Sequence, residues 1–261
     1  MANVTNVADI KSIAEFFLIS IAWTLTLFSP IASSRLTGNG FIKLITNLSI
    51  GSLVTAMIIS FISHNSPFNY PLYLKLISLS ALVATAFYHR DEKSFFMWIL
   101  YSLTVLFLGI HLILFSPILM NALFLLSSSL LLGIILYSML LGHWYLVVPK
   151  LSEHPLKVSA VFLWIILSIK IVVSLMSTYK HLDYFDQQTN LGAGYAFNWL
   201  LLLMRFLFGY IVIFGMSLFN WKLVTMRSIQ SSTGILYAMT FFIFIGELVS
   251  TYIFFNFGLY I

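Results

Sequence analysis

Eight long apolar runs, separated by short polar breaks, constrain this chain more than any other feature. A hydrocarbon core of about 30 Å is crossed by about 20 helical residues. In lipid, a helix satisfies its own backbone hydrogen bonds, whereas an open strand does not. The sequence therefore predicts an all-α, polytopic bundle of about eight transmembrane helices forming one integral membrane domain over residues 1–261. The predicted spans are 14–33, 41–62, 72–89, 95–116, 118–142, 156–177, 195–219 and 233–257.

Composition agrees with lipid as the solvent and excludes several chemistries. Hydrophobic residues make up 61% of the chain and charged residues only 8%, whereas soluble domains carry roughly 25% charged residues. The absence of cysteine excludes disulfides, thiolate metal sites and iron–sulfur clusters. The formal charge of +5 comes from basic residues concentrated near short loops, where they set membrane orientation. We therefore expect no nucleic-acid partner.

The basic residues predict the orientation of the bundle. Odd-numbered loops and their flanks hold eight of them, and the even loops with the N-terminus hold three. The eight are Arg35, Lys43, Arg90, Lys93, Lys150, Lys157, Lys222 and Arg227; the three are Lys11, Lys75 and Lys180. Because Lys and Arg accumulate on the cytoplasmic side, both termini are expected on the outer (non-cytoplasmic) side. We expect a multi-pass protein of a bacterial inner (plasma) membrane.

Ionisable residues inside the predicted spans are the first candidates for function. Lys170, Arg205 and Glu247 each lie 14 residues from the cytoplasmic end of their spans, a depth of about 21 Å, and His111 lies about 3 Å deeper. An isolated charge at such a depth costs at least about 2.5–3.5 kcal/mol. Arg205 and Glu247 are the natural pair, because a short loop joins their spans.

The pair has two interpretations that the sequence leaves open. It can be a static salt bridge that fixes helix rotation, or part of a ligand or proton site. Lys170 would then snorkel toward a phosphate, share Glu247, or face an anionic ligand.

Two histidines predict a possible cofactor site. His89 and His143 lie at the cytoplasmic ends of the third and fifth spans, and two neutral imidazoles on facing helices can ligate a b-type haem. The alternative is that they cap helix carbonyls or touch headgroups. His111 can bind a quinone oxygen, relay a proton, or hydrogen-bond to a neighbouring backbone group.

Three functions fit these residues. The favoured one is a membrane subunit of a redox or electron-transfer system that binds haem b or quinone, since the chain holds six histidines. The second is a small anion or proton-coupled transporter or channel, in which Arg205 and Lys170 attract an anion and Glu247 carries a proton. The third is a non-catalytic accessory or assembly subunit. Expected partners are the lipid bilayer and other membrane subunits, and enzymatic activity stays open.

Overall fold

The computed structural model describes residues 10–32, 34–63, 70–88, 95–115, 118–148, 151–182 and 194–261. Within these ranges the chain forms helices and no strands. In chain order they are α1 (Ile10–Phe28), the 3₁₀ turn η1 (Ser29–Ala32), α2 (Ser34–Thr37), α3 (Asn39–Ser63), α4 (Tyr70–Tyr88), α5 (Phe95–Leu114), α6 (Leu119–Val147), α7 (His154–Lys180), α8 (Tyr195–Phe206), the π-helical turn η3 (Leu207–Ile211), α9 (Val212–Thr225) and α10 (Ile229–Phe257).

The predicted membrane helix bundle is confirmed. Among the described residues, seven helices are long and apolar enough to cross a membrane, and α4 is a shorter apolar helix. The seventh predicted span is one continuous rod, because α8, η3 and α9 follow one another without a break. The fourth and fifth predicted spans are two separate helices, since α5 ends at Leu114 and α6 begins at Leu119.

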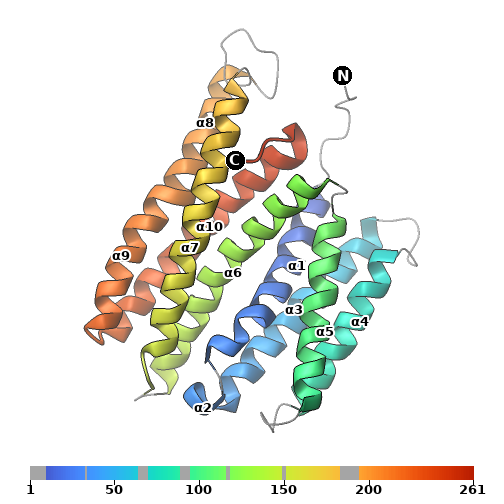
Figure 1. The fold of residues 1–261 in the computed structure, drawn as a ribbon, viewed down its shortest axis with the longest axis vertical. Coiled ribbons are helices and arrows are strands. Elements are labelled where there is room, and N and C mark those ends of the chain that lie inside the picture. The colour runs from blue at the N-terminus through green and yellow to red at the C-terminus, as the bar shows by residue number, and fades with distance from the viewer. Residues whose placement is uncertain are drawn as a thin grey trace.

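The helices form two groups on either side of α6 (Figure 1). One group contains α1, α3, α4 and α5, and the other contains α7, α8, α9 and α10. Helix α6 packs against α1 and α5 on one side and against α7 and α10 on the other. The start of α1 and the end of α10 lie at the same end of the bundle, here called the terminal end. Which side of the membrane this end faces stays a prediction.

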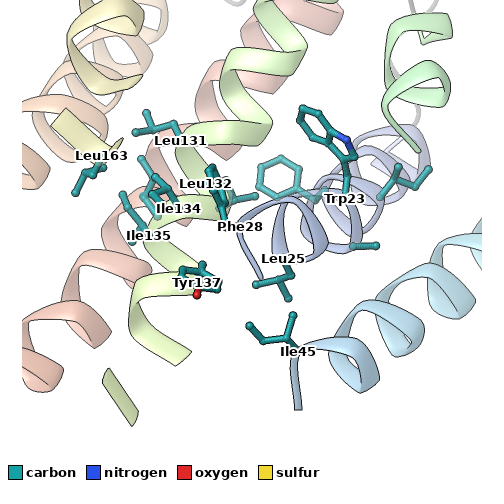
Figure 2. Close-up of a cluster of buried hydrophobic side chains, with 14 of the residues drawn as sticks. Trp23, Leu25, Phe28, Ile45, Leu131, Leu132, Ile134, Ile135, Tyr137 and Leu163 are labelled. Carbon is teal, nitrogen blue, oxygen red and sulfur yellow. The ribbon is translucent and has the colours of Figure 1, made fainter. Parts of the chain in front are cut away.

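An apolar core joins α6 to α1 (Figure 2). Gly133 of α6 lies against Thr24 of α1 so closely that a Cβ atom at Gly133 would collide with the threonine side chain. One turn away, the hydroxyls of Ser20 and Ser129 hydrogen-bond at 2.7 Å. Small residues allow this close packing in membranes, where no water drives helices together. This packing fixes the position of α6, whose opposite side contributes to the candidate functional site.

Candidate functional site: a buried charged triad

The three ionisable residues predicted inside the membrane meet in the structure. Lys170 of α7 and Arg205 of α8 have no solvent-exposed surface, and Glu247 of α10 is 1% exposed. Each lies ten residues from the residue that ends its helix at the terminal end: Lys180, Tyr195 and Phe257 respectively. This corresponds to a depth of about 15 Å. We call Lys170, Arg205 and Glu247 the buried triad.

The predicted Arg205–Glu247 pair is confirmed, and Lys170 shares the same carboxylate. Arg205 Nη1 lies 2.8 Å from Glu247 Oε1, and Lys170 Nζ lies 3.8 Å from Glu247 Oε2. Two cationic side chains thus face one anionic one, so the triad carries one excess positive charge when all three groups are ionised. Arg205 Nε and Glu247 Oε2 have no hydrogen-bond partner among the described residues.

Helix α6 supplies further acceptors for Lys170. Its ammonium group donates to the Ser128 hydroxyl and, at 3.4 Å, to the Phe124 carbonyl. It also lies 3.8 Å from the centre of the Phe124 ring, which is the geometry of a cation–π interaction. The ammonium group thus has two hydrogen-bond acceptors on α6, and Glu247, at 3.8 Å, contributes an ionic attraction rather than a hydrogen bond. Sequence reasoning missed Ser128 as a partner, because a serine in an apolar helix usually indicates helix packing.

Tyr210 completes the other side of the triad. Its hydroxyl accepts a hydrogen bond from Arg205 Nη2 at 2.6 Å and also bonds to the hydroxyl of Ser174. The guanidinium carbon lies 4.2 Å from the centre of the same tyrosine ring. A chain of polar contacts therefore runs from Ser128 through the triad to Tyr210 and Ser174. None of these neighbours was predicted from the sequence to contact the charged residues.

A π-helical turn makes the Arg205–Tyr210 bond possible. Residues five apart in an uninterrupted α-helix point in directions about 140° apart. Here the Val212 N–H donates to the Leu207 carbonyl five residues earlier, so the turn is one residue wider and brings both side chains to the same face. Such single turns occur often at functional sites. The sequence "RFLFGYIV" contains no pattern that predicts one.

Two glycines let the π-helical turn lie against α10. A Cβ atom added to Gly246 would lie 2.5 Å from the Gly209 Cα atom. One added to Gly209 would lie 2.6 Å from Arg205 Nη1. Because both positions lack a side chain, the two backbones touch and the Arg205 side chain crosses Gly209 to reach Glu247.

His111 lies apart from the triad. It is 3% exposed, its ring meets the edge of Phe115 at 5.8 Å, and neither ring nitrogen has a hydrogen-bond partner among the described residues. Bonding to a neighbouring backbone group, one of the three roles considered, is therefore not found in the part of the chain that the structure describes. In the same group of helices, Lys75 of α4 forms a buried ion pair with Glu15 of α1 and donates to Ser60 of α3.

The Glu15–Lys75 pair is a correction to the sequence analysis, which counted Lys75 among the basic residues of the even loops. Lys75 has no exposed surface and Glu15 is 6% exposed. Each lies five residues inside its helix, counted from Ile10 and Tyr70. The signal was present as two opposite charges at equal depth, but 60 residues of chain separate them, and the sequence does not reveal that α1 and α4 bring them together.

The predicted haem ligands are not brought together by any described contact. His143 is exposed near the end of α6, and its Nδ1 atom lies 2.8 Å from the Tyr237 hydroxyl of α10. His89 lies outside the described residues, and α4, which it follows, packs on α3 and α5. No group of three or more potential metal ligands from His, Asp and Glu occurs in the described ranges. Ligation by His89 and His143 stays a prediction.

No family model, curated protein or solved structure matches the chain. The buried triad lacks one negative charge, and such a site can become neutral in two ways. It can take up an anion, or one of its groups can release a proton.

Proposed function

We propose that the protein is a small transporter of a bacterial inner membrane that couples an anion to a proton at the buried triad. One observation carries the proposal: two fully buried cationic side chains share a single carboxylate. A static salt bridge needs only one cation for each carboxylate. The additional lysine makes the site expensive in hydrocarbon unless its charge is compensated.

Coupling follows from the charge balance. With the proton on Lys170, the triad attracts an anion; with the proton released, that attraction is lost. By thermodynamic linkage, if protonation raises the affinity for the anion by a given factor, the bound anion raises the affinity for the proton by the same factor. Anion and proton would then occupy the site together and leave it together.

Lys170 is the group in this proposal that exchanges the proton. An arginine keeps its proton in proteins, and Glu247 faces a cation at each oxygen. The sequence analysis placed the proton on Glu247 instead. We assign the proton to Lys170, because, of the two cations, its ammonium group lies farther from the carboxylate than the Arg205 guanidinium does, at 3.8 Å against 2.8 Å.

A flux experiment tests the proposal. The purified protein is reconstituted into liposomes containing a pH-sensitive dye, and potassium chloride, nitrate or sulfate is added outside. We expect acidification of the lumen with at least one anion, and loss of that signal in Lys170→Met and Glu247→Gln. Lys43→Gln, which removes an exposed cation of α3, serves as the control and should retain the wild-type rate. Equal proton flux in wild-type and Lys170→Met proteoliposomes would refute the proposal.

A redox subunit is the second candidate, and His143 supports it. When a histidine binds a metal through one ring nitrogen, its other ring nitrogen is usually hydrogen-bonded. His143 Nδ1 has such a hydrogen bond, with the Tyr237 hydroxyl. The test is an absorption spectrum of the purified protein, oxidised and reduced with dithionite. A Soret band that disappears in His143→Ala would establish a haem ligand. A blank spectrum would leave transport as the better-supported function.

A further inference from the structure

A groove lies on the surface of the bundle along one face of α7, beside Trp221 of α9, at the end opposite to the terminal end. Its lining is almost wholly apolar, and two ionisable side chains of the first turn of α7 lie at one extremity. The lining residues are His154, Lys157, Val158, Val161, Phe162, Ile165 and Trp221. A hydrogen bond of 2.9 Å from Trp164 Nε1 to the Ser217 hydroxyl joins the two helices nearby.

The length of the groove along α7 matches the thickness of one leaflet. His154 begins α7, and the deepest lining residue, Ile165, follows eleven residues later. At 1.5 Å per residue this is about 16 Å, roughly half the thickness of a hydrocarbon core. The polar residues therefore lie at the level of headgroups, and the apolar ones lie at the level of an acyl chain. The tryptophan is of the type that anchors helices at this boundary.

The mouth of the groove has an excess of positive charge. Glu153, just before α7, lies 3.3 Å from Lys157 Nζ and 3.0 Å from an Arg227 guanidinium nitrogen. One carboxylate thus serves two cations, which leaves one positive charge in excess. Arg227 is 75% exposed on its side chain and Lys157 is 32% exposed, so both remain accessible to an anion. A zwitterionic headgroup would not balance this charge.

We propose that this groove binds an anionic phospholipid, with one acyl chain along α7 beside Trp221 and the phosphate against Lys157 and His154. The site is independent of the buried triad. The predicted orientation agrees with the proposal, because this end of the bundle is expected to face the cytoplasmic leaflet, to which anionic lipids attract basic segments.

Native mass spectrometry of the delipidated protein tests the proposal. The protein is incubated with equal amounts of phosphatidylglycerol and phosphatidylcholine that carry the same acyl chains. We expect one phosphatidylglycerol to bind in clear preference. Lys157→Gln should weaken that binding about fivefold, the effect of one cation near a membrane surface. Lys43→Gln removes an exposed cation near the start of α3, at the same end, and should leave the preference unchanged.

Two further variants separate a lipid site from a structural role. Glu153→Gln frees two cations, so we expect phosphatidylglycerol to bind about fivefold more tightly. A loss of affinity in this variant would mean that the ion pairs only hold the loops together, and would overturn the proposal. Ile165→Trp fills the groove and should reduce lipid binding. Three other results would also overturn the proposal. They are equal retention of both lipids by the wild type, equal effects of Lys157→Gln and Lys43→Gln, and a dimer in place of a lipid adduct.

Discussion

Neutralising the buried triad one group at a time should give strongly unequal losses of stability. At an effective dielectric constant of about 20, the 2.8 Å and 3.8 Å separations correspond to attractions of roughly 6 and 4 kcal/mol. Glu247→Gln removes both attractions and leaves two buried cations without a counter-charge. Breaking a buried pair in this way typically costs about 3–5 kcal/mol, and we expect a loss in that range.

Lys170→Met should behave differently. The substitution removes one attraction, but it also removes the desolvation cost of an ammonium group and its repulsion by Arg205. The remaining Arg205–Glu247 pair is balanced. Replacing a buried ionic group with an apolar side chain of similar volume is often neutral, so we expect a change of at most about 1 kcal/mol. The double variant Lys170→Met/Glu247→Gln should be more stable than Glu247→Gln alone, because only one uncompensated cation remains.

Equilibrium unfolding in mixtures of dodecyl maltoside and dodecyl sulfate, followed by tryptophan fluorescence, measures these differences in the free energy of unfolding. Circular dichroism before unfolding checks that each variant retains its helices. Equal losses in the two single variants would refute the reasoning, because they would show that Lys170 and Glu247 act as a balanced pair. A double variant less stable than Glu247→Gln would refute it as well, since Lys170 would then contribute stability without the carboxylate.

Three further predictions concern the surroundings of the triad and the loops. Gly246→Ala should destabilise the fold by about 1–3 kcal/mol through overpacking against Gly209. Gly234→Ala, on the same helix but facing open space, should not destabilise the fold. The same unfolding assay measures both variants. Tyr210→Phe leaves a buried guanidinium donor without its acceptor and should cost about 1–3 kcal/mol in that assay. A hydrogen bond to its own backbone N–H and another from a guanidinium group lower the pKa of Glu153 from 4.5 to about 2. The stability that this carboxylate contributes is therefore complete above about pH 4.5 and lost as the pH falls toward 2. The melting temperatures of wild type and Glu153→Gln should differ at pH 7 and converge as the pH falls over that interval.

Part of the candidate site could be predicted from depth alone. Lys170, Arg205 and Glu247 were equally far from the ends of their apolar runs, and charges in lipid must find partners at their own level. Equal depth correctly predicts the Arg205–Glu247 pair. His111 was expected close to the same level, but it lies apart from the triad, because α5 and α7 belong to groups on opposite sides of α6. Depth specifies a layer of the membrane, whereas the neighbours within that layer depend on helix packing.

The sequence by itself determined that this chain is a membrane helix bundle, because runs of about 20 apolar residues have one stable environment and one secondary structure there. Tertiary structure decided which charges meet. It paired Glu15 with Lys75 across 60 residues, and it brought Tyr210 to Arg205 through a π-helical turn. The physical reason is that hydrophobicity places a residue along the membrane normal, whereas its rotation and neighbours depend on close contacts such as that between Gly209 and Gly246.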